Sequence, residues 1–375
     1  MSSLRVAIVH DWLVAAGGAE RVLARMLQLF PQAQLYALFG DTSAIPMKPD
    51  GRHATTSWLQ HVPGLRHIYR NLAPVMPWAV ESLRIPDVDL VISSAWAFAH
   101  GVKPPAGTPH LAYIHSPMRW AWDMQQDYLD QAGLSRHSLL GGLARWQIQR
   151  LRDWDIQAAQ RPTRLVANSR FIQGRIERCW QRPSDCLYPP VRAPLQAQAI
   201  EAAISHGAFI TMSRLVGYKR VDAIVQAFAL LPHRQLIVAG DGPERARLQA
   251  MASPNVTFTG WVTEDRATQL LAGSRGFIQA SKEDFGIAAV EAQACGVPVL
   301  AYGQGGALET VRANEPNPTG MHVEDLSPQA LAESIELFAT HSFRPQDCQA
   351  NARRFSPEAF DSGLLHLIES TLSGS

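Results

Sequence analysis

Two glutamates eight residues apart mark a loop and a short helix in the second half of the chain. The stretch reads SKEDFGIAAVEAQACGVPVLAYGQGG and covers residues 281–306. Glu283 falls in the loop ahead of the helix. Glu291 falls within the helix among small apolar residues, so its carboxylate is expected to be partly buried. A buried charge needs a partner, and the two hydroxyls of a ribose would supply one.

Two cations lie in another loop that follows an apolar run. The segment SRLVGYKRVDA places Arg214 at the end of a predicted strand and Lys219 five residues later, before a helix. Cations in such loops are commonly just solvated. Together with the free N–H groups of Gly286 and Ile287, however, they would form a cradle for a diphosphate. Groups of this kind stabilise the charge on a departing diphosphate, and metals are not the only means of doing so.

A pair of glycines, Gly17 and Gly18, separates the first apolar run from the first predicted helix. The pair permits a tight strand-to-helix turn. It would equally let a ligand approach the backbone at a helix N-terminus, where N–H groups favour negative charge. Spacing alone leaves both interpretations open. The Gly-x-Gly-x-x-Gly and Walker A patterns do not occur in the sequence.

Composition excludes several classes of protein. The 375 residues are 46% hydrophobic and 18% charged, which suits two ordinary domains rather than a disordered chain. The formal net charge of +1 is spread along the chain, which argues against nucleic acid as a partner. The four cysteines are scattered and fit neither a metal knuckle nor a disulfide framework. No apolar run is long enough to span a bilayer, so we expect a cytoplasmic protein that at most adheres to a membrane surface.

Apolar runs and helical patterns alternate in two series joined by a proline-rich segment at 189–198. Such alternation predicts an α/β fold with two parallel sheets, each covered by helices on both faces. Open sheets of this kind bind ligands outside the carboxyl ends of their strands, where the loops described above fall. A long helix is also expected at 139–160. The predicted strands are RVAIVHDW, AQLYALFG, DLVISSA, HLAYIHS and TRLVANS, then FITMSRL, QLIVAGDG, NVTFTGWV, GFIQAS and PVLAYG.

Several of these segments, taken together, resemble a known family. The Glu-x7-Glu segment of retaining glycosyltransferases of family 4 is similar to EDFGIAAVEAQACGVPVLAYGQGGALETV. Three other segments resemble the same family and occur in the same order: SRLVGYKRVDAIVQAFALLP, LIVAGDGPER and NVTFTGWV. HDWLVAAGGAERVL, YIHSPMRWAWD and LVANSRFIQGRI resemble bacterial members that extend lipid-linked exopolysaccharide or O-antigen units. The resemblance implies the GT-B fold, two doubly wound Rossmann-like domains facing across a cleft.

The resemblance also implies domain limits. Residues 1–192 would form the acceptor-side domain and residues 193–355 the domain that binds the nucleotide-sugar. A final helix at 356–375 would cross back onto the first domain.

The resemblance assigns roles to single residues of the second domain. Arg214 and Lys219 would hold the donor diphosphate, Glu283 would contact hydroxyls of the transferred sugar, and Glu291 would bind the ribose. The loop around Glu283 would be lined by Phe285, Gly286 and Ile287, and Val262 would lie near the base.

In the first domain, Gly17 and Gly18 would lie close to the diphosphate and the acceptor. His115 would approach the transferred sugar from the opposite domain.

The mechanism that the resemblance implies retains the anomeric configuration. No carboxylate is placed as an evident covalent nucleophile, so a front-face substitution is expected, with the diphosphate helping to deprotonate the acceptor hydroxyl. Asp-x-Asp occurs at Asp87/Asp89 and at Asp153/Asp155, but neither pair suits a metal bound to the donor. We therefore expect a metal-independent enzyme without a cofactor.

Two other classes of protein stay open: a sugar-nucleotide epimerase of GT-B fold and a non-catalytic sugar-nucleotide-binding subunit. The donor is also open. Resemblance favours GDP-mannose, with UDP-sugars and GDP-fucose as alternatives, and a glycan linked to a polyprenyl diphosphate as the acceptor in bacterial surface polysaccharide synthesis.

The segment TTSWLQHVPGLRHIYRNLAPVMPWAVESLR mixes apolar and basic residues. It would either pack against the first sheet or form a surface that rests reversibly on anionic lipid at the cytoplasmic face of the inner membrane. Its apolar members are Trp58, Leu65, Ile68, Tyr69, Leu72, Val75, Met76 and Trp78, and its basic members include Arg66, His67, Arg70 and Arg84.

Overall fold

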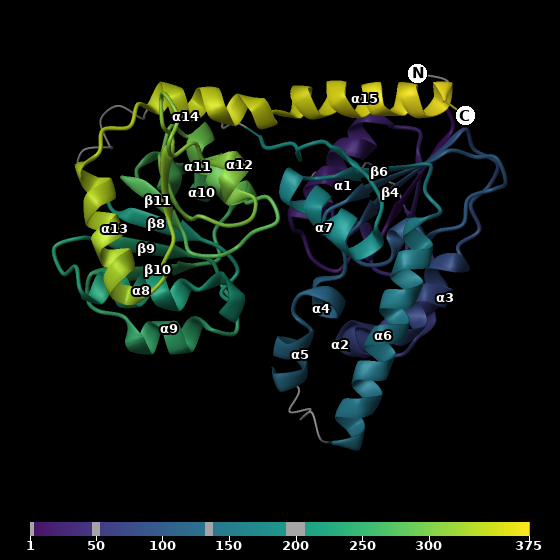
Figure 1. Ribbon diagram of the computed structural model, residues 1–375, viewed down its shortest axis with the longest axis horizontal. Helices are drawn as coiled ribbons and strands as arrows, with labels where there is room; N and C mark the ends of the chain where they lie inside the picture. The colour runs from purple at the N-terminus through teal and green to yellow at the C-terminus, as the bar shows by residue number, and fades with distance from the viewer. Residues whose placement is uncertain (1–3, 47–52, 132–137, 193–206, 375) are drawn as a thin grey trace. The chain divides into compact units, whose positions relative to one another are not determined.

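The structure is a computed structural model, and it describes residues 4–46, 53–131, 138–192 and 207–374. The chain forms two compact units, shown in Figure 1. The first comprises Met1–Tyr188 together with Phe360–Ser375, and the second comprises Pro189–Ala359. Each unit has its own parallel sheet with apolar cores on both faces, which is the property of an independent domain.

Seven parallel strands form the sheet of the first unit within the described residues. They are β1 (Val6–His10), β2 (Gln34–Ala37), β3 (Ala54–Thr56), β4 (Leu90–Ala95), β5 (His110–Ile114), β6 (Arg164–Ala167) and β7 (Asp185–Cys186). Their order across the sheet is β3-β2-β1-β4-β5-β6-β7. The central strands β1, β4 and β5 are buried along their whole length, as expected when helices cover both faces of a parallel sheet.

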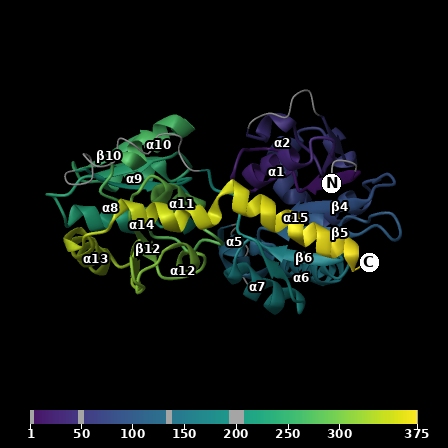
Figure 2. The same ribbon diagram turned by 90° about the horizontal axis from the view of Figure 1, so that it is seen from above.

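One face of this sheet is covered by α1 (Gly18–Leu29) and α15 (Pro357–Ser373). Phe360, Leu364 and Ile368 of α15 pack against residues of β4, β5 and β6, and Figure 2 shows the helix running across these strands. The C-terminal segment of the chain is therefore part of the first unit's core.

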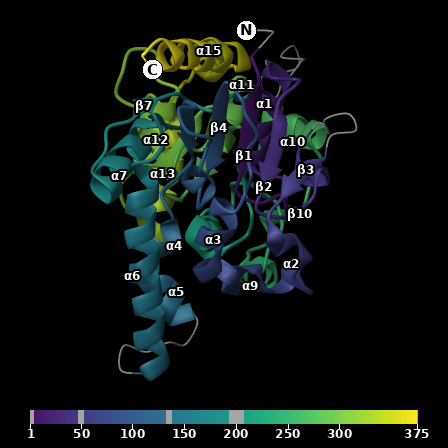
Figure 3. The same cartoon turned by 90° about the vertical axis from the view of Figure 1, so that its right-hand side faces the viewer.

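The opposite face is covered by α6 (Leu139–Ala159), α7 (Arg170–Trp180) and short helical segments. Among the described helices α6 is the longest, and Figure 3 shows it extending past the sheet. Ser138 and Ser169 cap α6 and α7, because each hydroxyl accepts a hydrogen bond from the backbone N–H three residues later. The short segments of this unit are η1 (Thr42–Ala44), η2 (Trp58–His61), α2 (Leu65–Ile68), η3 (Tyr69–Val75), α3 (Met76–Glu81), η4 (Ala99–Gly101), α4 (Arg119–Trp122) and α5 (Gln125–Gln131).

Six parallel strands form the sheet of the second unit within the described residues. They are β8 (Phe209–Met212), β9 (Leu236–Ala239), β10 (Val256–Gly260), β11 (Gly276–Gln279), β12 (Val299–Tyr302) and β13 (Gly320–Val323), in the order β10-β9-β8-β11-β12-β13. One face packs on α8 (Val221–Ala229), α9 (Arg245–Met251) and α13 (Pro328–Thr340). The other packs on α10 (Glu264–Ala272), α11 (Ile287–Ala294) and α12 (Ala307–Thr310). The remaining elements are η6 (Gly217–Lys219), α14 (Pro345–Ala352) and η7 (Arg353–Phe355).

All ten strands predicted from the apolar runs are present, and the two doubly wound units confirm the predicted α/β fold class. The sequence did not predict β3, β7 and β13. Each of them lies at an edge of its sheet and is only two to four residues long, so it gives no apolar run. Part of the predicted proline-rich link, from residue 193 onward, lies outside the described residues.

The four cysteines differ in exposure. Cys179, Cys295 and Cys348 are buried, whereas Cys186 on β7 is partly exposed. Burial raises the pKa of the three buried thiols to about 11, 12 and 12. Within the described part of the chain, no helix combines the length and the apolar character needed to cross a bilayer.

Candidate functional site

The structure brings two of the predicted site residues of the second unit into direct contact. Lys219 Nζ lies 2.5 Å from Glu283 Oε1, and the hydroxyl of Ser281 donates to the same oxygen at 2.5 Å. Lys219 ends η6 in the loop after β8, and Glu283 follows β11, which is the neighbour of β8 in the sheet. The carboxyl ends of two adjacent parallel strands therefore place the cation and the carboxylate together.

Arg214 lies two residues after the end of β8 and is exposed. No side chain among the residues that the structure describes forms an ion pair or hydrogen bond with its guanidinium. Its charge is consequently not neutralised within the described chain, while that of Lys219 is balanced by Glu283. Of the two predicted site cations in this loop, Arg214 thus has no acidic partner among the described residues, and Lys219 has Glu283.

The loop of Glu283 is fastened to the loop after β12, which explains the Gly-Gln-Gly-Gly sequence there. The backbone N–H of Gly306 donates to the carbonyl oxygen of Glu283 at 2.9 Å. A Cβ on Gly306 would lie 2.4 Å from Cα of Phe285, and Gly305 has a φ of 70°. Only glycines allow this close approach, so the two loops hold the Glu283 backbone in one position.

The start of α11 leaves backbone donors for a ligand. Gly286 is its N-cap with a φ of 91°, and among the described residues none accepts a hydrogen bond from the N–H of Gly286 or Ile287. Phe285 is buried edge-to-face against Phe355, so only its backbone can line the loop. Gln279 lies beneath Gly286, and its Nε2 is buried without a hydrogen-bond partner among the described residues. The N–H groups of Gly286 and Ile287 therefore have no acceptor among the described residues, and their binding of a diphosphate stays a prediction.

Glu291 and Val262 are placed by neighbouring elements of the same unit. Glu291 lies in the second turn of α11 and is partly exposed, as its small apolar neighbours predicted. Val262 follows β10 and packs in part against the core between this sheet and α11. A ligand contact of either side chain stays a prediction.

The glycine pair begins α1 in the first unit. Gly17 is its exposed N-cap, and Gly18 is the first helical residue. The buried carboxylate of Glu20 lies directly beside this turn, since a Cβ on Gly17 would lie 3.0 Å from Glu20 Oε2. The turn is therefore tight, and its outer side is open to solvent.

His115 follows β5 and is buried, with a hydrogen bond of 2.9 Å between its Nε2 and the hydroxyl of Ser94. Burial, with a smaller contribution from the nearby His10, lowers the pKa of His115 to about 3. Its imidazole is therefore neutral at physiological pH and would contact a sugar as a hydrogen-bonding group rather than as a cation.

Sequence reasoning missed Asp11, the residue after β1. Its carboxylate accepts four backbone N–H groups, those of residues 96 to 99, at distances from 2.6 to 2.9 Å. Asp11 is fully buried and fixes the loop after β4, the strand that carries Ser94. A polar residue directly after a buried strand was the available signal.

The first Asp-x-Asp pair binds an arginine. Asp89 Oδ1 lies 2.7 Å from Nη2 of Arg5, and Asp87 Oδ2 lies 3.4 Å from Nη1 of the same side chain. The pair joins the chain before β4 to the chain before β1, so its carboxylates already have a structural partner.

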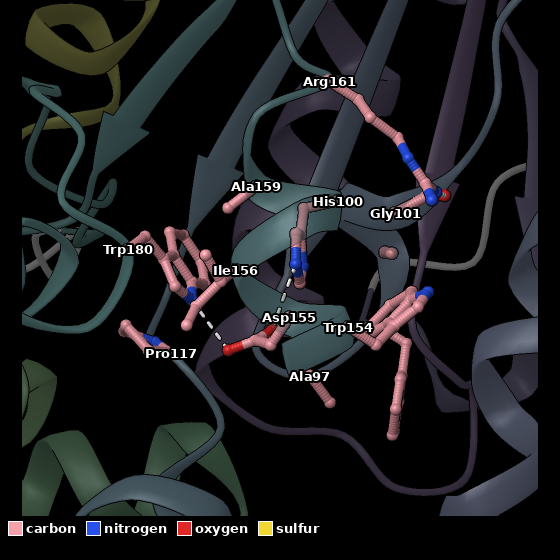
Figure 4. Close-up of polar contacts among 12 residues, drawn as sticks. Ala97, His100, Gly101, Pro117, Trp154, Asp155, Ile156, Ala159, Arg161 and Trp180 are labelled. Atoms are coloured by element: carbon pink, nitrogen blue, oxygen red, sulfur yellow. Dashed lines mark hydrogen bonds and ion pairs between the residues drawn. The ribbon is translucent and has the colours of Figure 1, made fainter. Parts of the chain in front are cut away.

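The two aspartates of the second Asp-x-Asp pair differ in burial. Asp153 is exposed on α6, whereas Asp155 is fully buried. Asp155 Oδ2 accepts hydrogen bonds from the indoles of Trp122 at 2.8 Å and Trp180 at 2.7 Å. Figure 4 shows His100 on the other side of the carboxylate, where Nε2 lies 3.2 Å from Oδ1 without the geometry of a hydrogen bond. Asp155 thus links α6 to α7 and α4.

The apolar and basic segment between β3 and β4 is partly core and partly surface. Leu65 and Met76 are buried in the core of the first unit, while Trp58, Ile68 and Trp78 are exposed by 46%, 38% and 65%. The basic side chains on the surface of this segment include Arg66, His67, Arg70 and Arg84. Side chains that are partly buried against the core include Tyr69, Leu72 and Val75. The packing interpretation therefore holds for the buried and partly buried residues, while contact of the exposed ones with lipid stays a prediction.

Comparison with known proteins supports the resemblance. Residues 203–355 match the family of glycosyl transferases group 1. A GDP-mannose-dependent monoacylated alpha-(1-6)-phosphatidylinositol monomannoside mannosyltransferase of Corynebacterium glutamicum is 35% identical over 138 residues, 33% of this chain and 35% of its own. An N-acetyl-alpha-D-glucosaminyl L-malate synthase of Bacillus anthracis is 35% identical over 112 residues, 28% of this chain and 29% of its own. The chain thus spans about a third of the length of the curated relatives it matches.

Solved structures extend the likeness to the whole chain at the level of fold. The crystal structure of Anabaena Alr3699/HepE in complex with UDP aligns with a TM-score of 0.71 and 19% sequence identity, over 98% of this chain and 100% of the other. The predicted GT-B class of fold is confirmed. In sequence over its second unit, and in fold over its whole length, the chain resembles the glycosyl transferases of group 1 and the bacterial mannosyltransferases among them.

Proposed function

We propose that this chain is a retaining glycosyltransferase that moves a hexose from a nucleotide-sugar to a hydroxyl of a glycan acceptor. The proposed donor is GDP-mannose, and the proposed acceptor is a lipid-linked glycan of bacterial surface polysaccharide synthesis. The match to a GDP-mannose-dependent relative supports this choice of donor. The UDP in a structural neighbour and the N-acetylglucosaminyl relative keep UDP-sugars as the alternative.

One observation carries the proposal: Lys219 and Glu283 meet at 2.5 Å beside the uncapped start of α11, with Arg214 exposed in the same loop. Two cations and a helix N-terminus suit a diphosphate. A carboxylate next to them suits the hydroxyls of the sugar that the diphosphate carries. The chemistry is a front-face substitution, in which these groups stabilise the departing diphosphate and His115 contacts the transferred sugar.

The test is a thermal-shift panel of nucleotide-sugars followed by a transfer assay with radiolabelled donor. A ligand at 100 times its Kd adds about 2.7 kcal/mol of stability, so the true donor should raise Tm clearly above the others. GDP-mannose should give the largest shift. Isomerised donor without any acceptor would identify an epimerase instead. Binding with neither transfer nor slow hydrolysis of the donor would identify a non-catalytic subunit.

The ribose assignment predicts the effect of Glu291→Ala. Loss of this carboxylate removes an acceptor for two ribose hydroxyls, so affinity should fall equally for the nucleoside diphosphate and for the whole donor. Isothermal titration calorimetry measures both. Glu333→Ala, an exposed glutamate on α13 of the same unit, is the matched control and should change neither affinity. Unchanged nucleotide affinity in Glu291→Ala would remove this residue from the ribose site.

The enzyme is proposed to be independent of metals. Activity measured in excess EDTA should equal activity in untreated buffer, because Arg214, Lys219 and the start of α11 would stabilise the diphosphate without a divalent cation. Loss of activity in EDTA that Mg²⁺ or Mn²⁺ restores would contradict this proposal.

We also propose reversible contact with anionic lipid at the cytoplasmic face of the inner membrane. Trp58, Ile68 and Trp78 are exposed near basic side chains on the first unit, which suits an interfacial surface. Each basic residue adds roughly 1 kcal/mol near an anionic surface, enough for reversible binding. The purified protein should therefore co-sediment with anionic liposomes and be released by about 0.5 M salt, which screens charges within a few ångströms.

Charge reversal tests this surface. Replacing Arg66 and Arg70 by Glu should abolish co-sedimentation while transfer to a short soluble acceptor continues. Replacing Arg247 and Arg266 by Glu makes the same change in net charge on the second unit and should leave co-sedimentation intact. Failure of the wild-type protein to co-sediment with anionic liposomes would exclude the lipid contact.

A further inference from the structure

A hollow of about 530 Å³ lies on the first unit where α4, α5 and α6 meet. Figures 1 and 3 show α4 and α5 beside the half of α6 that extends past the sheet. Ligand-binding pockets have volumes of about 300–1,000 Å³, so this hollow is large enough for a small ligand. The described residues that line it are Trp122, Asp123, Gln125, Gln126 and Arg145.

Two of the lining side chains are held in place by residues of α6. The indole N–H of Trp122 donates to Asp155 Oδ2 at 2.8 Å, and the guanidinium carbon of Arg152 lies 5.2 Å from the centroid of the same ring. Nη2 of Arg152 also donates to Gln125 Oε1 at 2.6 Å. Trp122 and Gln125 are therefore positioned before any ligand binds, which reduces the entropic cost of binding.

A buried arginine connects the hollow to the loop that carries His115. Arg175 of α7 is 3% exposed and forms an ion pair with Asp123. Its Nη1 donates to Oγ of Ser116, the residue directly after His115, at 2.8 Å. The residues from His115 to Asp123 all belong to the connection between β5 and α5. The hollow is thus built in part from the same connection as the histidine that is proposed to contact the transferred sugar.

The two glutamines of α5 offer hydrogen-bonding groups whose kinds follow from their partners. Arginine only donates, so the atom of Gln125 that meets Arg152 is the oxygen, and its Nε2 remains a donor. An ionised carboxylate only accepts, so Gln126 donates from Nε2 to Asp130 Oδ1 at 2.7 Å, and its Oε1 remains an acceptor. Within the described residues neither remaining group has a hydrogen-bond partner. Adjacent residues of the lining therefore supply one donor and one acceptor.

We propose that this hollow binds a neutral sugar of the acceptor glycan. Every hydroxyl of a pyranose both donates and accepts, so neighbouring hydroxyls match the donor of Gln125 and the acceptor of Gln126. The C–H face of the ring is apolar and packs on an aromatic side chain, which Trp122 supplies. Arg145 adds donors and Asp123 adds acceptors to the same lining. The role of the sugar as part of the acceptor rests on the proposed function, whereas its binding needs no donor.

Gln126→Trp tests the hollow by filling it. Gln126 is exposed, and its side chain bonds to Asp130 one turn later, so a larger side chain should not disturb the core. Gln149→Trp is the matched control, because Gln149 is also exposed and donates to Asp153 one turn later at 2.9 Å. Gln149 is on α6 and is not among the described residues that line the hollow.

The first experiment is saturation-transfer difference NMR on the full chain without donor. The probes are the methyl glycosides of mannose, glucose, galactose, rhamnose, fucose and N-acetylglucosamine. At least one probe should receive saturation from the wild type and from Gln149→Trp, and this signal should be lost in Gln126→Trp. Gln126→Ala removes the acceptor without adding bulk. It should weaken the signal, and it decides the question if Gln126→Trp does not fold.

Three results would overturn sugar binding in the hollow. The first is no saturation of any probe by the wild type, and the second is an unchanged signal in the Gln126 variants. The third is loss of the signal in inorganic phosphate but not in chloride of equal ionic strength, which would identify an anion site instead.

The second experiment asks whether the bound sugar belongs to the acceptor. Transfer is measured to the octyl glycoside of the sugar that binds in the first experiment. Gln126→Trp should raise the KM for this acceptor about tenfold, the equivalent of about 1.4 kcal/mol, and should affect donor hydrolysis much less, because water does not need the hollow. Gln149→Trp should change neither rate.

Equal loss of transfer and of donor hydrolysis in Gln126→Trp would overturn the acceptor role of the hollow. A wild-type chain that turns over no nucleotide-sugar would instead defeat the proposed function. The NMR result would then still decide whether the hollow binds a sugar.

Discussion

Lys219→Ala and Arg214→Ala should each reduce turnover at least 100-fold. A lost contact to the charge that develops on a leaving group costs about 2.7–4 kcal/mol in comparable oxyanion sites. The structure adds a reason for Lys219: its ammonium neutralises Glu283 at 2.5 Å. Lys219→Ala therefore also leaves that carboxylate without its cation, next to the position proposed for an anionic donor. Initial rates of donor hydrolysis and transfer measure the effect.

Arg247→Ala is the matched control for both variants. Arg247 is a cation of the same unit on α9, where it pairs with Glu244 at the surface. Its removal should change turnover by less than about twofold, since exposed ion pairs contribute little. Near-normal rates in both Lys219→Ala and Arg214→Ala would exclude these cations from the active site.

Asp155→Ala should lower the free energy of unfolding of the first unit by about 3 kcal/mol or more. Two indole N–H groups would lose their acceptor, that of Trp180, which is buried, and that of Trp122, which is partly buried, and the loss of a buried bond costs about 1–3 kcal/mol. Urea unfolding followed by intrinsic fluorescence measures this unit selectively. Of the ten tryptophans Trp261 alone lies in the second unit, which leaves nine in the first.

Asp153→Ala removes the same charge from the same helix and should be nearly neutral. Asp153 is exposed and accepts a hydrogen bond from Gln149, one turn earlier on α6. Surface changes of this kind stay within about 0.5 kcal/mol. Equal midpoints for Asp155→Ala and Asp153→Ala would show that the links from the buried carboxylate on α6 to α4 and α7 do not stabilise the first unit.

Strand positions were predictable where a strand is buried on both faces, because such a strand appears in the sequence as an apolar run. VAIVH and LVISSA form central strands that are buried throughout, and their composition alone indicates it. β7, by contrast, is the two-residue edge strand Asp185–Cys186. This strand forms because it pairs with the edge of β6, so tertiary contacts determine it rather than the local sequence. Short edge strands of this kind therefore cannot be predicted from hydrophobic periodicity.

The two halves of the site differ in how far the sequence could predict them. Lys219 and Glu283 lie in loops after strands of one parallel sheet, so their meeting follows from the fold class once the strands are adjacent. The buried contacts that link Glu20, His10, Ser94 and His115 need the exact neighbours β1, β4 and β5 and the register between them. A single sequence states neither strand order nor register, because both are set by packing between distant segments.

The uneven burial of the cysteines makes the chain suitable for labelling at one native position. Thiol reagents attack the thiolate, and burial both shields Cys179, Cys295 and Cys348 and keeps them protonated. Cys186 is partly exposed and lies three residues before the second unit begins at Pro189. A maleimide dye added to the folded protein would therefore couple there first. The chain could then carry a single fluorophore near the sequence boundary of the two units without any substitution.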